Sequence, residues 1–307
     1  MKDAVLKTVN LSKRYKDVTV LDNVNITINK GDIYGFIGQN GAGKTTLMKL
    51  ISGLIIKDSG TIELFGENDT RNIENMRKRM GCLIETPALY DYSSVYDNLE
   101  INRIQKGIPG RESIDKVLKM VGLYNERKKQ VRKLSMGMKQ KLGLAMALIG
   151  DPEFLILDEP INGLDPMSII EIRKLLNKLN KEFDVTILIS SHILSELYQF
   201  ANSYGIIHNG RLVEQITSRE LEERCQKFLY IRTDNAERAV FTIERILKTQ
   251  NYEVMHDNAI KLYEYLDEPS KVASVLLNNG SLVDEIALKG DNLEDYFSKL
   301  VWRNKNV

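Results

Sequence analysis

A glycine-rich segment, GQNGAGKTT at residues 38–46, constrains the fold of this chain more than any other feature. It follows the apolar run IYGFI at residues 33–37, which predicts a buried strand, and it precedes a predicted helix. In this setting Gly38, Gly41 and Gly43 allow the backbone to wrap a phosphate with its N–H groups, at the positive end of the helix. Strand, turn and helix together predict a phosphate-binding loop (P-loop).

A second segment, FLILDEP at residues 154–160, supplies acidic side chains for the same chemistry. Its apolar run predicts a buried strand, and open α/β sheets place their ligands at the carboxyl ends of such strands. Lys44 is expected to reach the β- and γ-phosphates of a nucleotide, and Thr45 to ligate Mg²⁺. Asp158 is expected to hold the same ion through water, and Glu159 to act as general base on the attacking water. Without the P-loop, these two carboxylates would indicate only a solvated strand end.

Charge and hydropathy argue against a nucleic-acid-binding, a membrane-spanning and a secreted protein. Lys and Arg total 43 against 42 Asp and Glu, a net charge of +1, so the chain lacks the basic footprint of a nucleic-acid-binding domain and we expect no nucleic-acid partner. No stretch reaches the roughly 18 consecutive apolar residues that a membrane-spanning helix needs. The N-terminus also lacks the apolar region of a secretory signal. Any work at a membrane is therefore expected to involve another polypeptide.

The order of the predicted elements before residue 220 indicates an α/β domain. Two β-rich runs, at residues 4–9 and 24–28, precede the P-loop, and a helix is expected to open at Ser168. Buried strands without polar alternation, such as residues 186–189, are separated by helices. This pattern predicts a parallel sheet that is covered on both faces.

A change in pattern near residue 220 predicts a second domain. The later elements follow the order βαββαβα, with the last helix at residues 293–301. This order predicts a small α+β unit, for which a ferredoxin-like fold is one interpretation. The predicted domains are residues 1–220 and residues 221–307.

The segment LSMGMKQ at residues 134–140 resembles the signature of ABC-type ATPases. Ser135 and Gly137 are in their usual places, whereas Met136 and Met138 are departures from the pattern. Ser135 is also a good N-cap for the helix that is expected to follow. In that family the serine both caps the helix and takes part in the signature. The resemblance implies that this helix N-terminus faces the γ-phosphate bound by the opposite subunit of a dimer.

Three further positions extend this resemblance over residues 1 to about 220. Asp165, in NGLDP, is similar to the aspartate of the family's D-loop, although Ile161 stands where threonine is more usual. His192 follows a predicted strand, as the switch histidine of the family does. Tyr15 matches the aromatic residue that stacks on adenine.

The resemblance implies an ATP-binding and hydrolysing subunit that powers a separate integral-membrane permease from the cytoplasmic face of the membrane. The implied fold is a P-loop ATPase domain with a mixed sheet and a helical subdomain that contains the signature. The implied cofactors are ATP and Mg²⁺, and the implied assembly is a homodimer, or a heterodimer with a related ATPase subunit, that encloses two ATP molecules. The residues expected to contact nucleotide are Tyr15, Gly38, Asn40, Gly41, Ala42, Gly43, Lys44, Thr45, Thr46, Ser135, Gly137 and Asp165. The expected metal ligands are Thr45, Asp158 and Glu85, and the expected catalytic residues are Glu159, His192 and Glu85.

Glu85 is the departure that narrows the resemblance, because the family normally has glutamine at this position. A carboxylate still offers an oxygen to Mg²⁺, but it adds negative charge near the γ-phosphate. With glutamate at this position, the chain resembles the ATPases of the bacitracin-resistance and lantibiotic-immunity transporters. This resemblance implies export of, or immunity to, an antimicrobial peptide or drug. A neutral exchange of glutamine for glutamate is the alternative explanation.

A non-transport ABC ATPase that acts as a regulatory or sensing module is the alternative function. Translation-associated members have two cassettes in one chain, whereas one is present here. Chromosome-organising members interrupt the cassette with a long coiled coil, and no sustained heptads separate Lys44 from Asp158. These differences favour the transporter subunit.

Overall fold

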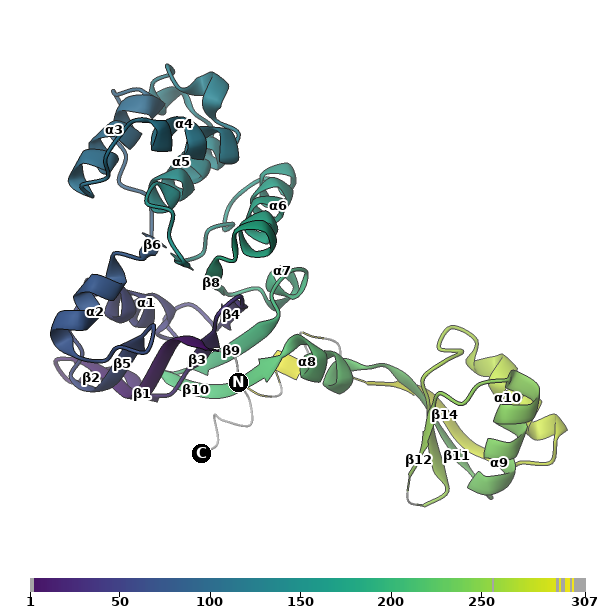
Figure 1. Ribbon diagram of the computed structural model, residues 1–307. Helices are drawn as coiled ribbons and strands as arrows, with labels where there is room; N and C mark the ends of the chain where they lie inside the picture. The colour runs from purple at the N-terminus through teal and green to yellow at the C-terminus, as the bar shows by residue number, and fades with distance from the viewer. Residues whose placement is uncertain (1–2, 256, 291–292, 294–295, 299, 301–307) are drawn as a thin grey trace. The chain divides into compact units, whose positions relative to one another are not determined.

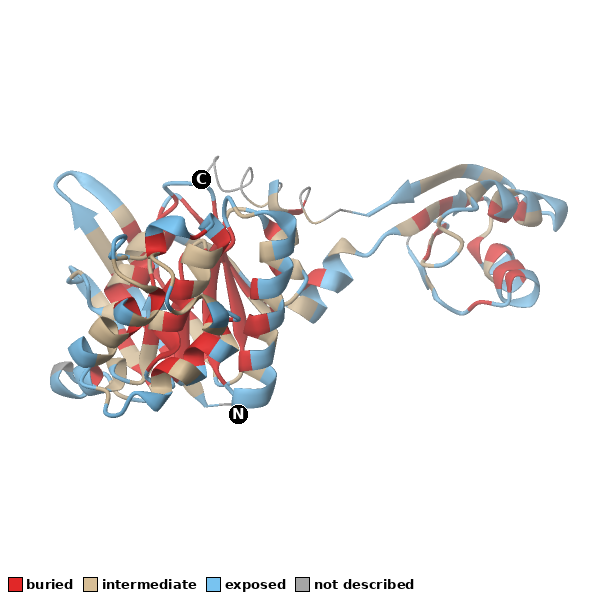
Figure 2. Ribbon diagram, turned by 90° about the horizontal axis from the view of Figure 1, so that it is seen from above, coloured by how far each residue is buried: buried red, intermediate tan, exposed pale blue. Residues whose placement is uncertain are grey.

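The computed structural model describes residues 3–255, 257–290, 293, 296–298 and 300 (Figure 1). The chain divides into two compact units, Met1–Ser218 and Arg219–Val307, and each is described by itself. In the first unit, buried residues follow the central strands, and exposed residues lie on the outer faces of the helices (Figure 2).

A 6-stranded mixed sheet forms the centre of the first unit, in the order β10-β9-β4-β8-β7-β6. Its strands are β4 (Ile33–Ile37), β6 (Met80–Leu83), β7 (Phe154–Leu157), β8 (Thr186–Ser191), β9 (Ser203–His208) and β10 (Arg211–Thr217). All neighbours are parallel except β9 and β10. Every residue of β4, β7 and β8 is buried, which explains why these strands lack polar alternation.

A second, antiparallel sheet packs against this core. Its strands are β1 (Ala4–Tyr15), β2 (Val18–Val24), β3 (Thr27–Asn29) and β5 (Ser59–Leu64), and β1 pairs with the other three. The expectation of one strand at residues 24–28 is wrong. Asn23 is left-handed (φ 49°) and the Asn25 side chain donates to the Asn23 carbonyl, so the chain turns between β2 and β3.

Helices complete the first unit. They are α1 (Lys44–Ser52), α2 (Thr70–Arg77), α3 (Val95–Gln105), α4 (Glu112–Met120), α5 (Met136–Leu148), α6 (Pro166–Phe183) and α7 (Leu194–Tyr198), with 3-10 turns at Tyr124–Glu126 and Val131–Lys133. α3, α4 and α5 form a separate helical group (Figure 1). α6 begins at Pro166 rather than at Ser168, because Asp165 is its N-cap and proline fits the first helical position.

Gly60 in β5 allows a close approach to β1. Gly60 and Gly66 both have φ 84°, but a Cβ on Gly60 would lie 2.3 Å from the Asn10 carbonyl oxygen, whereas a Cβ on Gly66 would meet nothing within 4 Å. Gly60→Ala is expected to lower the free energy of unfolding by about 2–4 kcal/mol, from strain plus overpacking. Gly66→Ala, the matched control, has the backbone strain alone and is expected to cost about 1–2 kcal/mol. Urea unfolding measures both, and equal losses would show that the contact with β1 is unimportant.

The second unit contains an antiparallel sheet in the order β12-β13-β11-β14. After α8 (Ser218–Cys225) come β11 (Phe228–Thr233), α9 (Ala236–Thr242) with a π-helical turn Ile243–Leu247, β12 (Tyr252–Val254), β13 (Ala259–Leu262), α10 (Pro269–Asn278) and β14 (Val283–Lys289). Apolar residues of the strands and of both helices form one core cluster. The ferredoxin-like fold remains our interpretation of this order. The helix expected at residues 293–301 falls partly outside the described residues.

Candidate functional site

The predicted P-loop connects β4 to α1. Gly43 immediately precedes α1 with φ 108°, and a Cβ there would lie 2.9 Å from the Val20 carbonyl oxygen. Only glycine accepts both the conformation and this close contact with β2. The first turn of α1 therefore begins with free N–H groups beside the loop, as a phosphate-binding helix requires.

Lys44 lies inside the loop. Its side-chain Nζ donates hydrogen bonds to the carbonyl oxygens of Gly38 (2.7 Å) and Gln39 (3.3 Å), and it is 3.2 Å from Glu159 Oε1. The residue is only 5% exposed. A buried cation of this kind needs such partners, and an anionic ligand offers better ones.

The Asp158 side chain connects the P-loop helix α1 to β8. It lies directly after β7, is 5% exposed, and accepts hydrogen bonds from Thr45 Oγ1 (2.7 Å) and Ser190 Oγ (2.6 Å). A carboxylate beside a hydroxyl presents the oxygen ligands that Mg²⁺ prefers, and Mg²⁺ usually takes its remaining ligands from water and substrate phosphates. The donor set at Thr45 and Asp158 fits that ion.

Glu159 bridges two other predicted residues. Its Oε1 is 3.2 Å from Lys44 Nζ, and its Oε2 is 2.8 Å from Nδ1 of His192, which follows β8. The backbone at Glu159 is left-handed (φ 48°), and its N–H donates to Ser190 Oγ (2.9 Å). The structure thus brings a carboxylate, a lysine and a histidine together at the carboxyl ends of β7 and β8.

Ser190 is a site residue that the sequence analysis missed. It is fully buried and its hydroxyl links the Asp158 carboxylate to the Glu159 backbone. Only the strand pairing reveals this contact. Leu157 pairs with Ile189, so the residues that follow them, Asp158 and Ser190, lie side by side. Ser190 therefore stabilises the left-handed turn at Glu159 and helps to fix the positions of the Asp158 and Glu159 carboxylates.

A cavity of about 250 Å³ lies at this loop. It is lined by Val20, Asn40, Gly41, Gly43, Lys44, Thr45, Thr46, Glu159 and Asn162. Val20 and Asn162 were not predicted. Within the described part of the chain, Ser135, Gly137 and Asp165 do not line this cavity.

Ser135 and Asp165 instead cap two adjacent helices. Ser135 Oγ accepts from the Met138 N–H at the start of α5, and Asp165 accepts from the N–H and hydroxyl of Ser168 at the start of α6. The hydrogen bonds from Ser168 lower the pKa of Asp165. A Cβ on Gly137 would lie 2.4 Å from Ser168 Oγ, so the two helix N-termini pack closely.

Tyr15 and Glu85 are two predicted site residues that do not line this cavity. Tyr15 ends β1 with 47% of its surface exposed, and Lys13 Nζ is 5.2 Å from its ring centre. Glu85 follows β6 in a left-handed conformation (φ 60°), and its Oε1 is 2.6 Å from Lys49 Nζ. Of these two side chains, the tyrosine ring is open to stacking, whereas the carboxylate is already paired.

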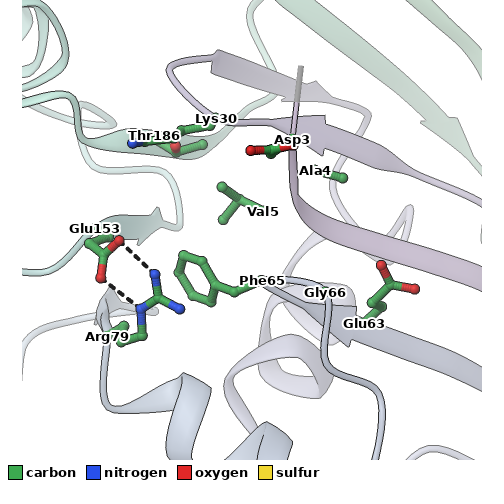
Figure 3. Close-up of a pocket in the computed structure, with 10 residues that line it drawn as sticks. All are labelled: Asp3, Ala4, Val5, Lys30, Glu63, Phe65, Gly66, Arg79, Glu153 and Thr186. Carbon is green, nitrogen blue, oxygen red and sulfur yellow. Dashed lines mark hydrogen bonds and ion pairs between the residues drawn. The ribbon is translucent and has the colours of Figure 1, made fainter. Parts of the chain in front are cut away.

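A larger cavity, of about 490 Å³, lies at the opposite ends of the parallel strands (Figure 3). Arg79 lines it, with two hydrogen bonds to the Glu153 carboxylate (2.6 and 2.7 Å) and its guanidinium 3.8 Å from the centre of the Phe65 ring. Ligands of open α/β sheets bind at the carboxyl ends of strands, whereas this cavity lies at the amino ends of β7 and β8. The ion pair is therefore expected to be structural.

No helix among the described residues has the length and apolar character to cross a membrane.

Comparison with known proteins agrees with this geometry. The ABC transporter family pattern matches residues 21–162. The bacitracin transport ATP-binding protein BcrA of Bacillus licheniformis is 45% identical over 297 residues, 97% of each chain. The lantibiotic transport ATP-binding protein SrtF of Streptococcus pyogenes is 45% identical over 222 residues, which cover 71% of this chain and 95% of SrtF.

Solved structures extend the agreement to the fold. An ATP-binding subunit of an ABC transporter superposes with a TM-score of 0.64 at 30% identity, over 71% of this chain and 92% of that one. CbiO1 of Clostridium perfringens, part of the transporter complex CbiONQ, gives a TM-score of 0.66 at 28% identity, over 80% and 97%. The P-loop, the carboxylates after β7 and the full-length similarity lead to one conclusion: the chain belongs to the ATP-binding proteins of the ABC transporter family.

Proposed function

We propose that this chain hydrolyses Mg-ATP to power a separate membrane permease that exports, or gives immunity to, an antimicrobial peptide or drug. The observation that carries the hydrolytic part is the Glu159 carboxylate, positioned between Lys44 and His192 beside the phosphate loop. Residues 1–220 are the proposed ATP-binding domain and residues 221–307 an accessory domain.

The proposed reaction uses contacts that exist before ATP arrives. Lys44 exchanges its bonds to the loop carbonyls and to Glu159 for the β- and γ-phosphate oxygens. Glu159 then accepts a proton from the water whose oxygen attacks the γ-phosphorus, while the bond to the β–γ bridging oxygen breaks. His192 holds the second carboxylate oxygen and so orients the base. Thr45 and Asp158 would hold Mg²⁺, whose positive charge would offset the charge of the phosphates when it is bound.

A dimer is proposed because the signature residues are not at their own chain's cavity. Ser135 and Asp165 lie at paired helix N-termini outside it, and the adjoining Met136 is 60% exposed. A helix N-terminus favours an anion, so a second copy, or a related ATPase subunit, is proposed to present its ATP there. Each ATP would then lie between one chain's P-loop and the other chain's signature.

The permease and its cargo are proposed from the named relatives. BcrA is similar along 97% of the chain, including the second unit, and SrtF along the ATP-binding unit. Docking on a permease would place this subunit at the inner face of the membrane. The exposed Tyr90 (52%) and Tyr92 (77%), close after Glu85, are available for such a contact.

Deletion of the gene together with its neighbouring permease gene is expected to raise susceptibility to bacitracin or to a lantibiotic. The reason is that ATP hydrolysis drives the removal of the peptide. Growth inhibition by a panel of membrane-active peptides measures the effect. Complementation by both wild-type genes is the positive control, and complementation by the permease gene with a Glu159→Gln version of this gene is the matched negative control. Unchanged susceptibility across the panel would contradict the proposed cargo and would favour a regulatory ATPase.

A further inference from the structure

An ion pair connects Glu85 to the P-loop helix. Lys49 Nζ on α1 is 2.6 Å from Glu85 Oε1, in the loop that follows β6. The lysine side chain is 29% exposed and the carboxylate side chain 60%. Lys49 does not line the P-loop cavity, so it has no evident part in binding the phosphates.

The pair lies one helical turn from the proposed metal site. Thr45 and Lys49 are four residues apart on α1, so they share one face of the helix, about 5–6 Å apart at their Cβ atoms. Thr45 bonds Asp158, and Lys49 bonds Glu85. The Glu85 carboxylate is therefore held beside the metal site but does not line the cavity.

Charge explains why a cation is useful at this position. The Glu159 carboxylate lines the cavity and the Asp158 carboxylate bonds Thr45, which also lines it, and a phosphate ligand adds more negative charge. A third carboxylate nearby would oppose phosphate binding unless a cation offset it. Lys49 is that cation, and its attraction for Glu85 competes with the attraction of a divalent ion for the same oxygen.

We propose that Lys49 is a positioning residue for Glu85. In the nucleotide-free chain it holds the carboxylate beside α1, and it releases the carboxylate toward the divalent ion when a metal–nucleotide complex fills the cavity. Only an ion pair is exchanged, and no covalent bond or proton moves. This inference rests on the proposed nucleotide site and deepens it.

Lys49→Met is expected to lower the apparent Kd for Mn²⁺ in the presence of saturating ADP by about 1.5- to 5-fold, the range typical of an exposed ion pair. Methionine keeps an unbranched apolar stem but removes the competing charge, so Glu85 is free to reach the ion. Electron paramagnetic resonance of free Mn²⁺ during titration measures this binding without hydrolysis. Lys49→Arg retains the charge and is expected to bind Mn²⁺ as the wild type does.

A double-mutant cycle separates the pair from a general effect of charge. In a Glu85→Gln background, Lys49→Met is expected to leave the Mn²⁺ affinity unchanged, because the amide forms no ion pair. Lys116→Met is the matched control, since Lys116 forms a similar exposed pair with Asp151 (2.7 Å) on another part of the unit. Circular dichroism confirms that each variant is folded.

Each result decides the question. Equal tightening by Lys49→Met in both backgrounds would assign the effect to overall charge and overturn the pair. No change with Lys49→Met, in a protein whose wild type binds Mn-ADP, would also overturn it while leaving the proposed function standing. A wild type that binds no Mn-ADP would reject the nucleotide site itself, and this inference with it.

Discussion

Glu159→Gln is expected to hydrolyse ATP about 10²–10⁴ times more slowly than the wild type and to accumulate as an ATP-bound dimer. Glutamine keeps the size of the side chain but cannot accept a proton from the attacking water. Its neighbours, Lys44 at 3.2 Å and His192 at 2.8 Å, remain able to hold it in place. Phosphate release measures the rate, and light scattering after size exclusion in saturating Mg-ATP measures the mass.

The control for this variant is a glutamate on the same unit outside the site. Glu182, at the end of α6, is 60% exposed and 3.8 Å from Lys178, so Glu182→Gln is expected to hydrolyse ATP at the wild-type rate. Normal ATP hydrolysis by the Glu159→Gln protein would show that Glu159 is not the general base. One that stays monomeric in saturating Mg-ATP would refute the shared nucleotide site.

Lys44→Met is expected to weaken Mg-ATP binding by at least about 30-fold. This corresponds to a loss of about 2 kcal/mol or more in binding free energy, which is typical when one partner of a buried charge pair is truncated. Lys44 is 5% exposed, and its ammonium lies between two loop carbonyls and Glu159, where the phosphates are expected to enter. Without it, the loop carbonyls and the Glu159 carboxylate face the phosphates directly, and like charges repel. Titration with a fluorescent ATP analogue measures the affinity.

Removing a buried cation can also disturb folding, so the Lys44→Met protein needs a structural check. Its circular dichroism spectrum is expected to match that of the wild type. Lys116→Met, which removes an exposed lysine from the same unit, is expected to bind the analogue normally. Wild-type affinity in a folded Lys44→Met protein would show that the cavity at this loop is not the nucleotide site.

Much of the candidate site could be predicted because its sequence patterns are local in the chain. The P-loop is one strand, one turn and one helix, and its glycines identify it without any distant contact. The apolar run before Asp158 and Glu159 likewise predicts a buried strand, since a strand covered on both faces needs no alternation. The structure then brings Lys44 and Glu159 within 3.2 Å, as expected from strand ends that meet at one edge.

Contacts between distant segments could not be predicted in the same way. The antiparallel pairing of β1 with β5 depends on the close approach at Gly60, and a glycine alone does not reveal which backbone it meets. Ser190 acts through the register of β8 against β7, and serine is a common residue in any strand. The helix α6 begins at Pro166, before the predicted start at Ser168, because Asp165 caps it.

The sequence by itself determined the P-loop, the carboxylates that follow β7 and the family resemblance, because each depends on residues that are neighbours in the chain. Only the tertiary structure decided that Glu85 pairs with Lys49, that Ser190 supports both carboxylates, and that Ser135 lies outside its own chain's cavity. Those facts depend on strand register and on side-chain direction. Both are set by packing between segments far apart in the sequence, which local patterns do not encode.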